Sequence, residues 1–70
     1  MDTCETQDGK QINDGVKLTL SLQHGTTVRE VKGKVRAFES DGETRWEILT
    51  NDPLRPAIGF LPENVLTYSK

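Results

Sequence analysis

Side chains that could perform acid–base or nucleophilic chemistry are scarce in this chain of 70 residues. It contains one histidine, His24, and one cysteine, Cys4. His24 falls in a predicted turn, where an imidazole is normally solvated. Cys4 lies in a segment poor in hydrophobic residues, far in sequence from any base that could activate its thiol. Phosphate-binding loops, nucleophile elbows and metal-ligand spacings do not occur in the sequence. We therefore expect a protein that is not an enzyme.

Three carboxylates, Glu39, Asp41 and Glu43, cluster around a predicted hairpin turn. Carboxylate oxygens can hold a hard cation. The common role of such a cluster is a soluble surface loop whose charges repel one another. We expect no metal and no cofactor.

A set of basic residues is more informative. Lys32, Lys34 and Arg36 occupy alternate positions, which places them on one face of a strand and about 7 Å apart. Phe38 continues this face, and Arg29 is close to it in sequence. A basic stripe that ends in an aromatic ring can contact phosphates and stack on a base. It is equally the pattern of a solvent-facing strand, in which lysine also discourages edge pairing.

The charge and composition limit the possible partners and compartments. The net charge of −2 argues against a strongly basic nucleic-acid binder. A single cysteine cannot form an internal disulfide, whereas small secreted domains usually carry several. We therefore expect a cytoplasmic protein. No apolar run is long enough to cross a membrane, so we expect no membrane partner.

The acidic groups are concentrated at the start of the chain. Residues 1–15 carry four acidic groups and one basic group, whereas residues 16–70 carry seven acidic and eight basic groups. Apart from Met1, Ile12 is the strong hydrophobe of the first 15 residues. Such a segment buries too little apolar area to offset its ordering entropy. We therefore predict an acidic, mobile leader over residues 1–14 and one small β-barrel domain over residues 15–70.

Hydrophobic alternation predicts the first long strands of the domain. Val16–Gln23 alternates apolar and polar residues without a break, as a half-buried strand does. A turn then leads into a second strand, Val28–Phe38. Val28 is out of phase with Val31, which predicts a bulge in the second strand. Gly33 falls on the apolar phase, which predicts a bend or a close crossing of another strand.

The remaining elements are short. Ser40-Asp41-Gly42-Glu43 is a hairpin turn signal, and it is followed by a strand over Thr44–Thr50. A strand from Pro56 to Leu61 leads into Pro62-Glu63-Asn64, which fits one tight helical turn. Val65–Tyr68 is the closing strand. Because five short strands must curl to hide their edges, we predict an all-β, five-stranded barrel with a short helical turn before its last strand.

Two segments resemble motifs of Src-homology-3 domains. They are Leu20-Ser21-Leu22-Gln23-His24-Gly25-Thr26-Thr27-Val28 and Gly59-Phe60-Leu61-Pro62-Glu63-Asn64-Val65-Leu66. Trp46 lies between them, 13 residues before Gly59, near the place where that family carries its groove tryptophan. The resemblance implies a Src-homology-3-like barrel with Trp46 at the edge of a binding groove and with Pro62 and Asn64 on its other wall. Tyr68 is the other aromatic residue that this groove could use.

The resemblance and the basic stripe lead to two functional hypotheses. The first is a non-catalytic binding module, a protein–protein adaptor or small regulatory subunit that uses the groove. The second is a nucleic-acid-binding barrel of the Tudor or KOW type that uses the basic stripe, because Val31-Lys32-Gly33-Lys34-Val35 resembles the Gly-x-Val step of those barrels. Trp46 itself could be either a core filler or an exposed binding anchor.

Overall fold

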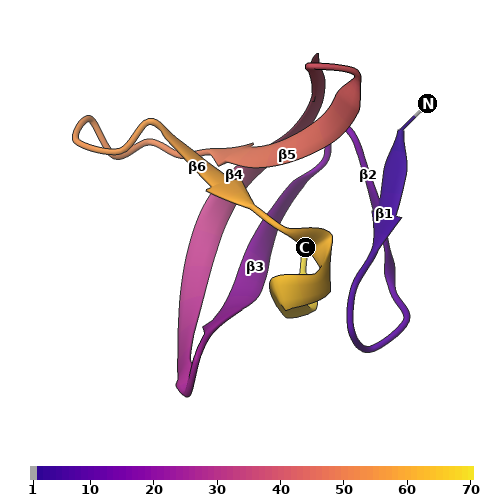
Figure 1. Cartoon of the computed structure of the whole chain (residues 1–70). Coiled ribbons are helices and arrows are strands. Elements are labelled where there is room, and N and C mark those ends of the chain that lie inside the picture. Colours follow the sequence, from indigo (N-terminus) through magenta and orange to yellow (C-terminus); the bar gives the residue numbers. More distant parts are fainter. Residues whose placement is uncertain (1) are drawn as a thin grey trace.

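A computed structural model describes residues 2–70, and nearly all of the regular structure is β-strand (Figure 1). The strands are β1 (Thr3–Glu5), β2 (Gln11–Asn13), β3 (Lys17–His24), β4 (Thr27–Ser40), β5 (Glu43–Leu49), β6 (Ala57–Phe60) and β7 (Val65–Ser69). One 3-10 turn, η1 (Pro62–Asn64), precedes β7. The all-β class and the helical turn before the last strand are therefore confirmed. Within residues 2–70, no helix is long and apolar enough to cross a membrane.

The strands form two antiparallel sheets. β1 and β2 make a two-stranded sheet, and the other strands make a five-stranded sheet in the order β6-β5-β4-β3-β7. The larger sheet curls, as Figure 1 shows, but over the described part of the chain its edge strands β6 and β7 do not pair with each other. The sheet is not closed, so the predicted single barrel is not confirmed.

β4 is the strand that bends the sheet. Residues 27–34 of β4 pair with β3, and residues 34–40 pair with β5. The close crossing predicted at Gly33 is present at this point. A Cβ atom on Gly33 would overlap the backbone oxygen of Leu49, and it would lie 2.8 Å from the Leu49 carbonyl carbon. The absence of a side chain therefore lets β4 pass against the end of β5.

The predicted bulge in the second strand is wrong. Pairing between β3 and β4 runs without a shift from Lys17–Lys34 to His24–Thr27. The register shift of the sheet lies instead between β3 and β7, next to Ser21 and Leu22. Val28 breaks the apolar phase simply because it points to solvent, with 55% of its surface exposed. It lies near the tip of the β3–β4 hairpin, beyond the core.

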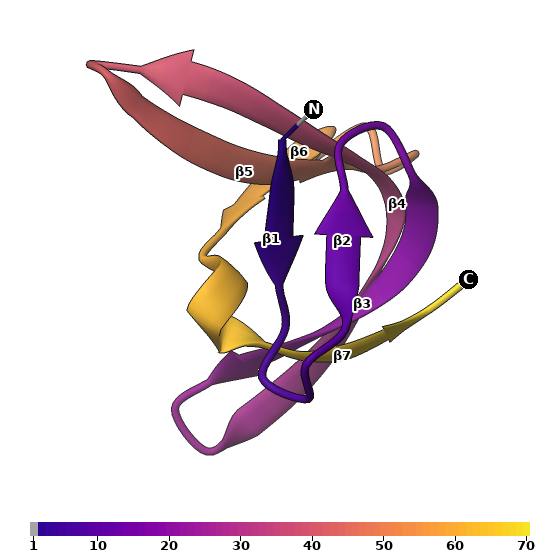
Figure 2. The ribbon, with the colours of Figure 1, turned by 90° about the vertical axis from the view of Figure 1, so that its right-hand side faces the viewer.

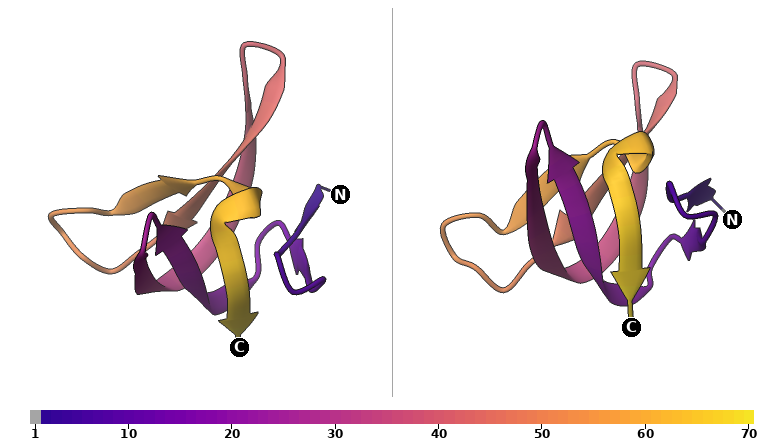
Figure 3. Two further views of the ribbon diagram at one scale, coloured as in Figure 1. Left: turned by 60° about the horizontal axis from the view of Figure 1, so that its bottom comes forward. Right: turned by 90° about the horizontal axis from the view of Figure 1, so that it is seen from below.

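The β4–β5 hairpin confirms the turn predicted from sequence. Ser40 pairs with Glu43, so Asp41 and Gly42 form a two-residue loop. Their φ angles are +53° and +79°, the signs that a type I′ turn requires. Figure 3 shows this hairpin projecting from the rest of the sheet.

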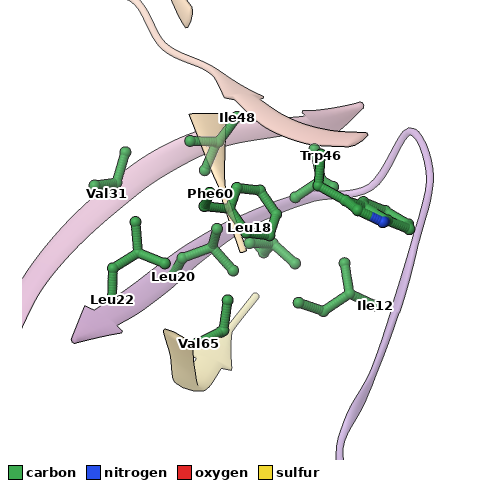
Figure 4. Packing of buried hydrophobic residues seen from close by; sticks show 10 residues of the cluster. Ile12, Leu18, Leu20, Leu22, Val31, Trp46, Ile48, Phe60 and Val65 are labelled. Carbon is green, nitrogen blue, oxygen red and sulfur yellow. The ribbon is translucent and has the colours of Figure 1, made fainter. Parts of the chain in front are cut away.

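The core lies inside the curl of the sheet. It is built from the alternating face predicted for β3, together with residues of the other strands (Figure 4). Its buried members are Ile12, Leu18, Leu20, Leu22, Val31, Val35, Trp46, Ile48, Phe60 and Val65. The predicted alternation of β3 is confirmed, and Val16 packs partly buried against this cluster.

The first residues of the chain form a hairpin that packs against β7 (Figure 2). The Gln7 amide donates a hydrogen bond to the Val65 carbonyl over 2.8 Å, and the Thr67 hydroxyl donates to the Asp8 carboxylate over 2.7 Å. Ile12 is only 1% exposed and belongs to the core. The mobility predicted for residues 1–14 and the boundary before residue 15 stay predictions, and Met1 lies outside the described residues.

Candidate functional site

A hollow of about 470 Å³ opens between the β4–β5 hairpin, β6 and η1. We call it the Trp46 hollow. Three of the four residues that the sequence placed in a groove, Trp46, Pro62 and Asn64, line it together. Its apolar lining consists of Leu22, Phe38, Trp46, Phe60, Leu61 and Pro62. Its polar lining includes His24, Glu43, Thr44, Arg45 and Asn64.

Trp46 belongs to the core and to the hollow at once. It is 6% exposed and packs against Phe60, with ring centroids 6.4 Å apart and the ring planes at 44°. Only a small part of the Trp46 side chain is therefore accessible, and that part contributes to the lining of the hollow. Most of its packing stabilises the fold, and the ligand-accessible apolar surface comes largely from its neighbours. Leu61, which is 56% exposed, is the most accessible of the large hydrophobic residues there.

The η1 wall of the hollow is held in place by its backbone. Pro62 occupies the start of the turn, where its fixed φ suits a helical conformation and its missing N–H is not needed. The Asn64 amide donates to the Leu61 carbonyl over 2.9 Å. The Gln7 side-chain amide donates to the Glu63 carbonyl over 2.7 Å, which ties η1 to the β1–β2 hairpin.

Tyr68, the fourth predicted groove residue, does not line the Trp46 hollow. Its hydroxyl donates to the Gln11 carbonyl over 2.7 Å, and the Lys10 ammonium lies 5.5 Å from its ring centroid. Lys10 also donates to the Tyr68 carbonyl over 3.3 Å. Tyr68 therefore holds the β1–β2 hairpin against β7.

Sequence reasoning missed Phe60 and Leu61 as lining residues. Both lie within the second motif, between Gly59 and Pro62, so the motif contained the signal. Phe38 was assigned to the basic stripe, but it lines the Trp46 hollow. Its position there depends on how the β4–β5 hairpin lies relative to β6 and η1, which the sequence pattern does not describe.

Charges at the mouth of the hollow are exposed. Arg45 and Glu43 approach within 3.8 Å of each other, and both side chains are more than half exposed. A pair of this kind contributes little to stability because water screens it. Glu43 belongs to the carboxylate cluster at the tip of the hairpin. Over residues 2–70, no group of three or more His, Cys, Asp or Glu side chains is placed to hold a metal ion.

The predicted basic stripe is divided by the structure. Lys32 and Lys34 are exposed and line a second hollow. Arg36 instead forms an ion pair with Glu47 at 3.6 Å and lies 5.8 Å from the ring centroid of Phe38. Arg29 lies two residues before the buried Val31, so the two side chains are on the same face of β4. Lys32 and Lys34 are on the opposite face.

Cys4 lies on β1, opposite Ile12. Partial burial raises the pKa of the Cys4 thiol to about 11. A protonated thiol is a poor nucleophile, because the reactive species is the thiolate. The geometry therefore gives Cys4 the character of a packing residue.

Comparisons with protein-family models, curated proteins and solved structures found no match for this chain. The resemblance to Src-homology-3 domains therefore rests on the two sequence motifs and on the order of the elements that they predicted. The Trp46 hollow, where one of those motifs meets Trp46, is the strongest candidate for a binding site.

Proposed function

We propose that this protein is a non-catalytic protein–protein binding module whose Trp46 hollow receives an extended segment of a partner protein. The observation that carries the proposal is the apolar lining of this surface hollow, to which Trp46 contributes from β5 and the adjacent Leu61 and Pro62 contribute from the junction of β6 and η1. A concave, mainly apolar surface with a few polar groups at its rim is the usual character of a binding site.

A free sheet edge beside the hollow supports an extended protein ligand. Among residues 2–70, β6 is an edge strand that pairs only with β5, and Gly59 and Phe60 of β6 line the hollow. The opposite edge strand, β7, is covered by the β1–β2 hairpin through Gln7 and Thr67. An uncovered edge can accept a further strand, so that main-chain hydrogen bonds give affinity and a neighbouring hollow accepts a side chain.

We further infer that the curled sheet is a variant of the Src-homology-3-like barrel and that the protein is a cytoplasmic adaptor or small regulatory subunit. The order of strands, the helical turn before β7 and the position of Trp46 support this inference. Such a barrel hosts many unrelated binding functions, so the hollow is the part of the structure that carries the functional proposal.

The test is to select peptide ligands from a random displayed library and to titrate them while following tryptophan fluorescence. Trp46 is the one tryptophan of the chain, so a change in its emission reports on this hollow. Leu61→Lys should weaken binding at least about tenfold, a change of about 1.4 kcal/mol. Leu54→Lys is the matched control, because Leu54 is 89% exposed and is not among the residues lining the hollow.

Both variants should retain the wild-type unfolding midpoint, because each replaces an exposed leucine. Equal loss of affinity in Leu54→Lys and Leu61→Lys would contradict the proposal, as would a library that yields no ligand able to change Trp46 emission. If nucleic acid were the ligand of the Trp46 hollow, Leu61→Lys would affect a partner that is lost on nuclease treatment and whose affinity falls steeply with salt.

A further inference from the structure

Four lysines surround a second hollow of about 550 Å³, on the outer face of the sheet. They are Lys17, Lys32, Lys34 and Lys70, and we call this site the lysine hollow. Lys17 and Lys34 are direct cross-strand partners on β3 and β4, and Lys32 lies two residues before Lys34. Lys70 follows Ser69, whose partner on β3 is Thr19. Residues far apart in sequence are therefore brought to one site.

The four charges are not neutralised by neighbouring side chains. In the part of the chain that the structure describes, the ion pairs involve Lys10, Arg36 and Arg45, and none involves a lysine of the hollow. Among residues 2–70, no Asp or Glu side chain lines the hollow. On the same face of the strands, Glu47 is paired with Arg36, and Glu30 lies two residues before Lys32 outside the lining.

This arrangement carries an energetic cost in the absence of a ligand. Like charges directly opposite each other on neighbouring strands destabilise a sheet. Lys17 and Lys34 are such a pair, and Lys32 adds a third charge on the same face. An anion placed between these ammonium groups would offset their repulsion, so the hollow is electrostatically suited to an anionic ligand.

The lysines favour contacts with phosphates over recognition of a particular base. A lysine ammonium is a compact, hydrated point charge without the planar fork that gives arginine its bidentate specificity. Lys32 and Lys34 are about 7 Å apart along their strand, so the charges are distributed over the hollow rather than focused on one point. A distributed set of ammonium groups suits a polyanion, because each phosphate contact releases a counterion.

We propose that the lysine hollow binds the phosphate backbone of a single-stranded nucleic acid, independently of its sequence. A flexible single strand can follow a concave site, whereas a duplex behaves as a stiff rod on this length scale. Beyond Lys34 on the same face of β4, Arg36 and Phe38 lie close together and provide a surface against which a base can stack. The lysine hollow and the Trp46 hollow share no lining residue. Phe38, the proposed stacking residue, lines the Trp46 hollow.

The experiment titrates a fluorescein-labelled oligothymidylate of about 12 nucleotides, a length within the range of site sizes of small barrels. Fluorescence anisotropy is measured over a series of salt concentrations. Each phosphate contact in a single strand contributes about −0.7 to the slope of log K against log salt, so four contacts give about −2.8. Lys34→Gln should reduce the magnitude of this slope by about 0.7. Replacing all four lysines with glutamine should abolish binding.

Arg55→Gln provides the matched control, because it removes the same charge from an exposed residue of the β5–β6 loop outside the lysine hollow. It should leave the salt slope unchanged. Lys34→Gln should keep or raise the unfolding midpoint, because it relieves the repulsion with Lys17. Leu61→Lys should retain oligonucleotide binding, so failure of one proposal is distinguishable from failure of the other.

Three results would overturn the proposal. The first is the absence of salt-dependent oligonucleotide binding by the wild-type protein. The second is an equal loss of slope in Arg55→Gln and Lys34→Gln, which would indicate only a general effect of net charge. The third is equally tight binding of a polyglutamate peptide of matching charge, which would assign the lysine hollow to an acidic protein segment.

Discussion

Replacing Gly33 with alanine should strongly destabilise this protein, because β4 crosses the end of β5 with no room for a side chain. A Cβ atom at Gly33 would overlap the Leu49 carbonyl oxygen, and it would lie 3.1 Å from Cγ1 of Ile48. The overlap is with backbone atoms, which cannot move aside as the end of a flexible side chain can. Relief therefore requires β4 and β5 to separate at the point where the sheet bends.

The magnitude follows from the cost of overpacking a core, which is typically about 1–3 kcal/mol and occasionally more. Because backbone must shift, we expect about 3 kcal/mol. A domain of 70 residues has a total stability of roughly 3.5–10 kcal/mol on a per-residue basis. Each kcal/mol lowers the melting temperature of a domain of this size by about 4–8 °C, so the expected decrease is at least about 12 °C.

Thermal unfolding followed by circular dichroism measures this difference, with Gly59→Ala as the matched control. A Cβ atom on Gly59 would meet only the Trp46 carbonyl oxygen, at 4.0 Å, which is an ordinary contact. Gly59→Ala should therefore leave stability unchanged or raise it, since glycine in a strand costs about 0.5–1 kcal/mol relative to alanine. A Gly33→Ala variant that melts within about 2 °C of the wild type would refute the reasoning. Such a result would mean that a methyl group fits between β4 and the Leu49 carbonyl without separating the strands.

Two further predictions concern the β1–β2 hairpin. Ile12→Ala should lower the free energy of unfolding by roughly 2–5 kcal/mol, because the Ile12 side chain is buried in the core. Urea denaturation measures this change. An unchanged free energy of unfolding would support the mobile leader predicted from the sequence. Hydrogen bonds from Thr6 and Thr67 lower the pKa of Asp8 below its ordinary value of 3.8. The ionised Asp8 carboxylate therefore stabilises the folded state above pH 3.8, and this stabilisation is lost as the pH falls through the pKa of the folded state. The melting temperature of Asp8→Asn should therefore be below that of the wild type at pH 7, and the difference should shrink as the pH falls below 3.8. A difference that stays constant with pH would show that the stabilisation by these hydrogen bonds does not depend on the charge.

The sequence determined the local elements of this protein. The unbroken alternation over Val16–Gln23 predicted β3 and its buried face, because a strand presents successive side chains to opposite sides. Asp41-Gly42 predicted the β4–β5 turn, because both residues tolerate positive φ. Gly33 on an apolar phase predicted a bend or a close crossing of another strand, and the structure shows that this strand is β5.

The candidate site residues were predictable where a local motif contains them. Pro62 and Asn64 belong to one short segment, and the resemblance of that segment to a Src-homology-3 motif implied their placement opposite Trp46. Tyr68 was assigned to the same groove because it is aromatic and follows that segment. Its contacts with Lys10 and Gln11 depend on where the first residues of the chain pack, and no pattern around Tyr68 encodes that packing.

Only the tertiary structure decided how the sheet ends and which charges meet. Whether β6 pairs with β7 depends on the curvature accumulated over the whole sheet, so strand patterns alone predicted a closure that the sheet pairing lacks. Ile12 reaches the core because the β1–β2 hairpin packs against β7. The composition of the first 15 residues predicted a mobile segment instead. Lys17 and Lys70 join Lys32 and Lys34 because β3, β4 and β7 are neighbours in the sheet. Such proximity arises from pairing between distant segments, whereas periodicity describes only the residues within one segment.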